Sequence, residues 1–283
     1  DISGLPRGRQ CGTSHTSTFW INLDACGLIC AIFTWGLILF GLAVADLFIV
    51  APSIEVNATA GWIHMLLLNM MGALALVSHV RAMVTDPGAV PRNAIPLDSA
   101  RGDYPRHCRR CNCFKPMQAH HCSICRRCIL HMDHHCPWVN NCVGLLNQKY
   151  FILFVFYIMT TCGYALMLVI HRLATCHHTS TGCAVGASGT ALVMVLVIVC
   201  ILFGLFTCCM FCDQMNVLMT HMTGIDRLKG EKKERRDLMS NLREVFGDRA
   251  SPLWWWLPVA PEWMDVEALR GYSQLPPSKD GGV

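Results

Sequence analysis

The chain has 283 residues, of which 53% are hydrophobic and 15% are charged, and its formal net charge is +4. This composition argues against an ordinary soluble protein and favours the membrane class. Because the net charge is small and no basic run resembles a nucleic-acid-binding arm, a nucleic-acid partner is not expected.

Four apolar stretches of the chain approach the length of about 20 residues that a helix needs to cross a hydrocarbon core of about 30 Å. The third and fourth stretches contain no charged residue and no polar face with a helical period, so buried helices of a soluble protein fit them poorly. The second stretch has Arg81 near its end, where a long side chain can reach the headgroups. We predict membrane spans at residues 26–45, 61–84, 151–170 and 189–212.

The Lys and Arg residues are unevenly distributed among the connections between these spans. Residues 46–60 contain none and residues 171–188 contain one, whereas residues 86–150 contain nine and residues 213–283 contain ten. In membrane proteins, connections rich in Lys and Arg face the cytosol. We therefore expect residues 46–60 and 171–188 to be luminal loops, and the segments 1–25, 85–150 and 213–283 to be cytosolic.

Two features of the predicted luminal loops remain open. Asn57 belongs to the only N-glycosylation sequon of the chain, and the sequence does not decide whether it carries a glycan. Cys176 and Cys183 form a disulfide or stay as two free thiols. In the tail, Trp254, Trp255, Trp256 and Trp263 suit a membrane interface, where tryptophan is enriched.

The central cytosolic segment is rich in metal-binding residue types, because residues 107–142 contain eight Cys and six His. Cys108 with Cys111, and Cys122 with Cys125, have the CxxC spacing with which two thiolates hold one metal ion. Disulfides are not expected in a reducing cytosol. The pattern predicts structural zinc, and the spacing alone leaves the pairing of the ligands open.

Asp133, His134, His135 and Cys136 place a carboxylate, two imidazoles and a thiol side by side in the sequence. A thiolate beside an imidazolium has a lowered pKa and is a nucleophile at neutral pH, and a carboxylate can orient the imidazole. Thiol and imidazole are equally good zinc ligands. From the residues alone, Cys136 is explained as well by a metal ligand as by a nucleophile.

Residues 133–144, DHHCPWVNNCVG, resemble the signature of the DHHC-type palmitoyltransferases. Residues 86–88, DPG, resemble a further motif of that family, and residues 223–226, TGID, resemble its TTxE motif with Gly for the second Thr and Asp for Glu. Asn241 and residues 245–247 resemble its C-terminal conserved segment. The resemblance covers about residues 20–260 and is strongest to the Golgi-type members.

The resemblance implies an all-α polytopic membrane protein with four transmembrane helices and a cytosolic, zinc-stapled β-hairpin domain rich in cysteine. It implies that two structural zinc ions are bound, the first by Cys108, Cys111, His121 and Cys128, and the second by Cys122, Cys125, His135 and Cys142. Both sites are then closed by four protein ligands. Cys113, His107, His120 and His131 receive no ligand role and are interpreted as surface or packing residues.

The resemblance also implies an enzyme, a protein S-acyltransferase. Cys136 is expected to take a palmitoyl group from acyl-CoA and pass it to cysteines of membrane-associated proteins, with His134 as base and Asp133 orienting His134. Arg126 and Arg127 are candidates for binding the CoA phosphates, or are merely positive residues of a cytosolic loop. The expected location is a Golgi or other endomembrane. The alternative functions are a membrane-anchored zinc-finger ubiquitin ligase and a trafficking scaffold, neither of which needs a reactive thiol.

Overall fold

The computed structural model describes residues 10–11, 20–97, 106–178, 186–230, 236–248 and 251–274. The chain divides into two compact units. Unit 1 comprises Asp1–Ala31, Val80–Phe151 and Asn216–Val283, and unit 2 comprises Ile32–His79 and Ile152–Met215. Unit 1 therefore contains the Cys-rich segment and the tail, whereas unit 2 contains most of the apolar stretches.

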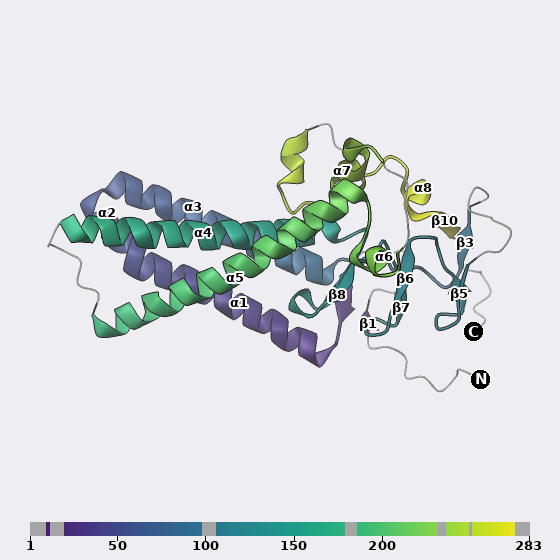
Figure 1. Ribbon diagram of the computed structural model, residues 1–283, viewed down its shortest axis with the longest axis horizontal. Coiled ribbons are helices and arrows are strands. Elements are labelled where there is room, and N and C mark those ends of the chain that lie inside the picture. The colour runs from purple at the N-terminus through teal and green to yellow at the C-terminus, as the bar shows by residue number, and fades with distance from the viewer. Residues whose placement is uncertain are drawn as a thin grey trace. The chain divides into compact units, whose positions relative to one another are not determined.

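Four helical segments in the described part of the chain are long and apolar enough to cross a membrane (Figure 1). The first begins with α1 (Ala25–Ala45) and continues through a π-helical turn, η1 (Asp46–Val50), and α2 (Ala51–Val56). The other three are α3 (Ala58–Val84), α4 (Gln148–His178) and α5 (Ala187–Thr220). The chain is thus a multi-pass membrane protein, as the sequence predicts.

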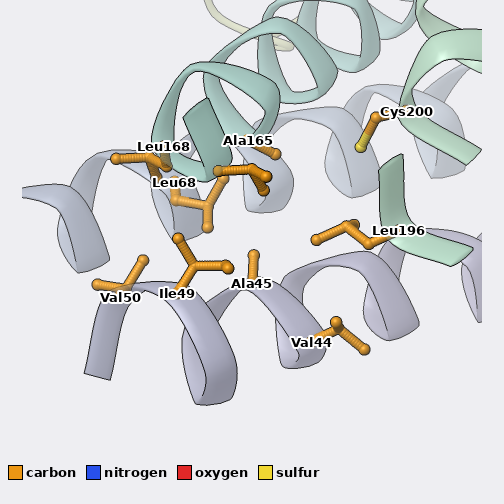
Figure 2. Packing of buried hydrophobic residues seen from close by; sticks show 10 residues of the cluster. Val44, Ala45, Ile49, Val50, Leu68, Ala165, Leu168, Leu196 and Cys200 are labelled. Carbon is orange, nitrogen blue, oxygen red and sulfur yellow. The ribbon is translucent and has the colours of Figure 1, made fainter. Parts of the chain in front are cut away.

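The helices of unit 2 pack through a cluster of buried aliphatic residues (Figure 2). Ala45 and Ile49 of the first helical segment meet Leu68 of α3, Ala165 of α4 and Leu196 of α5 in this cluster. Small residues let membrane helices approach closely. Gly72 of α3 is one example, because a Cβ atom there would lie only 2.6 Å from a methyl carbon of Leu42 in α1.

Two pairs of polar side chains within the spans satisfy one another. Asn69 donates to both carboxylate oxygens of Asp46, at 3.2 and 2.9 Å. The indole of Trp35 donates to Nδ1 of the buried His79 at 2.9 Å. Because an unpaired polar group in hydrocarbon is costly, such pairs allow these residues to lie inside a span.

The helices extend beyond the predicted spans, and the connection expected at residues 46–60 is helical except at Asn57. Only Asn57, with an extended backbone (φ −145°, ψ 96°), separates α2 from α3. Hydropathy reports where lipid covers a helix, whereas a helix ends where its hydrogen bonding ends. Pro52 does not end it, because proline is tolerated in a first helical turn. At the other expected loop, residues 171–188, α4 continues to His178. Cys176 of this helix is disulfide-bonded, and Cys183 lies outside the described residues.

Short antiparallel hairpins form the Cys-rich part of unit 1, as expected. Strands β4 (His107–Cys108) and β5 (Cys113–Phe114) pair, as do β6 (Ala119–Cys122) with β7 (Arg127–Leu130) and β8 (His134–Cys136) with β9 (Asn141–Val143). A 3-10 turn, η3 (Pro137–Val139), connects β8 to β9. Two further antiparallel pairs are β1 (Gln10–Cys11) with β2 (Ile21–Asn22), and β3 (Ala94–Pro96) with β10 (Tyr272–Gln274).

The tail of unit 1 contains α6 (Gly224–Leu228), α7 (Leu238–Phe246), the 3-10 helix η4 (Pro252–Trp255) and α8 (Val266–Arg270). The Thr223 hydroxyl accepts from the backbone N–H of Asp226, and the Asp226 carboxylate accepts from that of Thr223. This reciprocal cap fixes the start of α6. Aspartate thus caps the helix at the position where the TTxE motif has Glu.

Candidate active site and metal centres

The first cluster of potential metal ligands contains Cys108, Cys111, His121 and Cys128. The β6–β7 pairing sets His121 opposite Cys128, while the β4–β5 turn brings in the CxxC pair. His121 Nδ1 lies 3.7 Å from Cys108 Sγ and 3.1 Å from Cys111 Sγ, and the sulfur atoms of Cys111 and Cys128 are 3.7 Å apart.

The second cluster contains Cys122, Cys125, His135 and Cys142. His135 Nδ1 lies 3.8, 3.4 and 3.6 Å from the sulfur atoms of Cys122, Cys125 and Cys142. The sulfur atoms of Cys125 and Cys142 are 3.4 Å apart. The β8–β9 pairing sets His135 opposite Cys142.

Both clusters fit a tetrahedral zinc ion. Zinc bonds of about 2.0–2.3 Å separate the ligand atoms of a tetrahedron by about 3.3–3.8 Å, and nearly all the distances above fall there. Adjacent residues of one strand belong to different clusters, because successive side chains of a strand point to opposite faces. His121 therefore joins the first cluster and Cys122 the second, and the two sites are interleaved.

The same alternation separates Cys136 from the metal clusters. In β8, His135 joins the second cluster, while His134 and Cys136 share the other face of the strand. Cys136 is 6% exposed and belongs to neither Cys/His cluster. The sequence left Cys136 undecided between ligand and nucleophile, and the strand geometry favours the second interpretation.

A buried carboxylate orients His134. His134 Nδ1 lies 2.9 Å from Asp133 Oδ2, and the other oxygen, Oδ1, accepts the backbone N–H of Gly224 at 2.5 Å. Burial by itself lowers the pKa of His134, but the hydrogen bonds with Asp133 and Cys136 and the negative charges of these groups raise it to about 10. An imidazolium beside Cys136 is the arrangement that stabilises a cysteine thiolate.

Asparagine side chains hold the segment that carries Cys136. Asn141 Nδ2 donates to the carbonyls of Ala82 and Thr85, at 3.0 and 2.9 Å, at the end of α3. Asn140, in a left-handed conformation (φ 48°), donates to the carbonyl of Asn22 at 2.6 Å. The sequence alone gives these two residues no separate role. Their polarity next to an apolar segment was the available signal, because buried amides need partners.

His120 and His131, expected from the sequence to be surface or packing residues, contact acidic groups of the tail. His120 Nε2 lies 3.1 Å from Asp226 Oδ1, and His131 Nδ1 lies 3.2 Å from Glu244 Oε1. His131, His221 and Glu244 are close enough to hold a metal ion. However, Arg236 lies 2.6 Å from Glu244, and its positive charge opposes a bound cation, so we interpret this group as an ion-pair network.

A small cavity of about 240 Å³ in unit 1 is lined by basic residues, namely Arg106, His107, Lys115, His120 and Lys229. The predicted phosphate contacts lie elsewhere in the β6–β7 hairpin. Arg126 is exposed at its turn, and Arg127 donates to the carbonyl of Val90 at 3.0 Å. The cavity therefore gathers more positive charge than the Arg126–Arg127 pair.

Apolar helices, interleaved Cys/His clusters and a cysteine next to an oriented histidine fit a membrane-bound transferase that uses a thiol nucleophile. Residues 102–231 match the family model described as DHHC palmitoyltransferase. The chain is 41% identical over 250 residues to palmitoyltransferase ZDHHC3-A of Danio rerio, covering 84% of this chain and 78% of that protein. It is 40% identical over 254 residues to palmitoyltransferase ZDHHC7 of Mus musculus, covering 86% and 82%.

A plant protein, the probable protein S-acyltransferase 16 of Arabidopsis thaliana, is 40% identical over 114 residues, which are 36% of this chain and 40% of that protein. The chain belongs to the DHHC palmitoyltransferase family and is a protein S-acyltransferase. These matches give no support to a ubiquitin ligase or a trafficking scaffold.

Proposed function

We propose that the chain transfers palmitoyl or a similar long-chain acyl group from acyl-CoA to cytosolic cysteines of membrane-associated proteins, through an acyl-enzyme on Cys136. The observation that carries the proposal is His134, which shares the Cys136 face of β8, pairs with Asp133 and belongs to neither ligand cluster. Each methylene of an acyl chain prefers an apolar environment by about 0.8 kcal/mol, so a membrane-embedded enzyme suits this substrate.

In the first step, the Cys136 thiolate attacks the thioester carbonyl of acyl-CoA. A carbon–sulfur bond to Cys136 forms, the bond to the CoA sulfur breaks, and CoA leaves as a thiolate. The His134 imidazolium donates its proton to that thiolate, which makes CoA a neutral thiol. His134 is neutral at the end of this step, and Asp133 keeps its ring oriented.

In the second step, the substrate cysteine attacks the acyl-enzyme. The Cys136 thioester carries no charge, so no thiolate now favours the protonated form of His134, and the ring stays neutral. Neutral His134 then takes the proton of the incoming thiol, whose sulfur attacks the carbonyl. Cys136 leaves as a thiolate, and the thiolate–imidazolium pair is restored.

The two zinc ions have a structural role in this proposal. Cys108, Cys111, His121 and Cys128 would hold the first, and Cys122, Cys125, His135 and Cys142 would hold the second. Four protein ligands leave no open position for a substrate. Because His135 and Cys142 are paired across β8 and β9, next to the Cys136–Asn141 pair, the second ion would stabilise the hairpin that carries the nucleophile.

The phosphates of the CoA donor are proposed to bind in the basic cavity formed by Arg106, His107, Lys115, His120 and Lys229. Several positive groups around one concave space bind a phosphate better than two side chains on a hairpin. Arg126 and Arg127, the phosphate contacts expected from the sequence, are the alternative.

The proposed topology has the Cys-rich segment and both termini in the cytosol, and the ends of the spans near Asn57 and Cys176 in the lumen. The uneven distribution of Lys and Arg supports this orientation, and so does the disulfide of Cys176, which an oxidising lumen permits. The resemblance to Golgi-type members supports a Golgi location.

Labelled palmitoyl-CoA tests the proposal on the purified full-length chain. Wild type should acquire label that neutral hydroxylamine removes, and Cys136→Ser should not. Cys209→Ser, which changes an exposed cysteine of α5, should keep the label. A wild-type chain without label, or label that persists unchanged in Cys136→Ser, would overturn the mechanism.

A further inference from the structure

The tail of unit 1 exposes a run of apolar side chains that the catalytic proposal does not use. Residues 253–257, here called the tryptophan loop, include Leu253, Trp254, Trp256 and Leu257, which are 76%, 42%, 54% and 38% exposed. Large apolar groups gathered on one exposed segment mark an interaction surface. The loop is therefore a candidate for contact with an apolar partner.

The loop divides its tryptophans between two sides. Trp255 packs inward, because its ring stacks on Phe246 of α7 with 5.6 Å between centroids and 28° between planes. Trp254 and Trp256, on either side of it, are exposed. Trp255 thus attaches the loop to α7, while large parts of both neighbouring rings stay exposed. Trp263, expected at the interface from the sequence, also packs inward and donates its indole N–H to the Glu244 carbonyl at 2.8 Å.

A buried lysine in the first turn of α4 fixes the position of the tryptophan loop. Lys149 Nζ donates to the carbonyls of Trp254 and Val259, both at 3.0 Å, and so binds both ends of the turn. Lys149 is 1% exposed and is the second residue of α4. From residue 150 onward, α4 is an apolar helix that can cross a membrane. The loop is therefore held at the point where α4 would enter the bilayer.

We propose that the tryptophan loop docks in the headgroup region of the bilayer, beside the entry point of α4. Indole rings suit this region, because the ring enters the apolar layer while the N–H meets water or headgroups. The contact with Lys149 favours a bilayer as the partner. It holds the loop at the first turn of a membrane-spanning helix, where lipid headgroups are close by. The loop is thus a further membrane anchor of the catalytic domain, in addition to the spans.

The anchor connects to the active site through α7. Trp255 contacts Phe246 at the end of this helix, and Glu244 of the same helix contacts His131, two residues before Asp133. This part of the inference rests on the proposed function. It follows that membrane contact of the loop orients the face of the domain that carries Cys136.

Photo-crosslinking tests the docking on the full chain in nanodiscs of phosphatidylcholine and phosphatidylserine. The photoreactive residue benzoylphenylalanine replaces Trp254 or Trp256, one at a time, and intact mass identifies lipid adducts. Leu205, 64% exposed in α5, is the positive control, and Met117, 73% exposed in the Cys-rich part, is the exposed control outside the loop. Lipid adducts should form at residues 254, 256 and 205 and stay at least 5-fold lower at residue 117.

Absence of lipid adducts at both 254 and 256, with adducts present at 205, would overturn the proposal. A crosslinked dimer at these positions in place of lipid adducts would also overturn it and assign the surface to a second copy of the chain. In the Lys149→Met background, which removes the donors, adducts at residue 256 should fall several-fold; an unchanged yield would contradict anchoring through Lys149. Because the adducts do not depend on catalysis, a failure here is distinct from a loss of autoacylation.

Discussion

The backbone N–H of Gly224 donates to the Asp133 carboxylate at 2.5 Å, while the other oxygen of that carboxylate contacts His134 at 2.9 Å. The two residues are 91 positions apart, and the capped first turn of α6 brings them together. The motif that contains Gly224 thus reaches the active site through a backbone group and needs no side chain at this position.

Replacing Gly224 by proline should slow autoacylation. Proline removes this N–H, yet it is tolerated at the first position of a helix, and Thr223 has the extended backbone that precedes proline (ψ 164°). Asp133 loses a partner and His134 loses part of its orientation, so we expect a rate loss of about 10-fold. Single-turnover autoacylation measures it.

Gly224→Ala is the matched control, because it keeps the N–H. Its Cβ would lie 3.2 Å from the Asp133 carboxylate, which requires a shift of a few tenths of an ångström. The alanine variant should retain most of its rate. Equal rates for the proline and alanine variants would show that the hydrogen bond does not position Asp133.

Substitutions of the two neighbouring histidines should affect different properties, the autoacylation rate for His134 and the zinc content for His135. His134→Ala should reduce autoacylation by about 100-fold or more, because a general acid–base contributes about that factor, while the zinc content stays unchanged. His135→Ala should lose about one zinc ion per chain and destabilise the hairpin domain. Elemental analysis and autoacylation, measured on the same preparations, distinguish them. Loss of metal in His134→Ala would place that residue in a metal site.

The basic cavity and the Arg126–Arg127 pair predict different effects on the donor. Lys115→Ala should raise KM for palmitoyl-CoA by about 10-fold or more, since one hydrogen bond between charged groups contributes about 1.5–3 kcal/mol. Arg126→Ala should change KM little, and the autoacylation rate at saturating palmitoyl-CoA should be similar in both variants. A raised KM in Arg126→Ala with an unchanged KM in Lys115→Ala would instead indicate that the phosphates bind at the β6–β7 turn.

The turn at residues 86–88 predicts a pH effect on stability. Asp86 Oδ1 accepts the backbone N–H groups of Gly88 and Ala89 at 2.9 and 2.7 Å, and Gly88 has φ +100°, which favours glycine. Burial raises the pKa of Asp86 above its ordinary value. The folded state therefore holds this proton more tightly than the unfolded state, and its stabilising effect is lost as pH rises from about 4 through the folded pKa.

Asp86→Asn keeps the accepting oxygen and removes the charge. Relative to wild type, its melting temperature should therefore increase as pH rises through the pKa of Asp86. Thermal unfolding between pH 4 and 8 measures this difference. A difference that is constant with pH would contradict a raised pKa of Asp86, and Asp86→Ala, which loses both hydrogen bonds, should be less stable at every pH.

The sequence predicted the elements whose signal is local. Span positions follow from runs of apolar residues, and the hairpin metal domain follows from CxxC spacing with nearby histidines. The sequence did not predict where a helix ends, because helix ends depend on hydrogen bonding, and the first helical segment continues to Val56. It also did not reveal that Arg127 is engaged by Val90 or that Trp255 and Trp263 face inward, because these contacts join distant segments.

By itself, the sequence determined that this chain crosses membranes and that its central segment carries metal-binding and nucleophilic residue types, because hydrophobicity and ligand chemistry belong to single residues. Only the tertiary structure decided how these residues are shared. Strand alternation turns His135 toward a metal cluster and His134 and Cys136 toward the opposite face. Likewise, only folding brings Gly224 to Asp133 and Lys149 to the tryptophan loop, since hydrogen bonds between distant segments exist only in the packed chain.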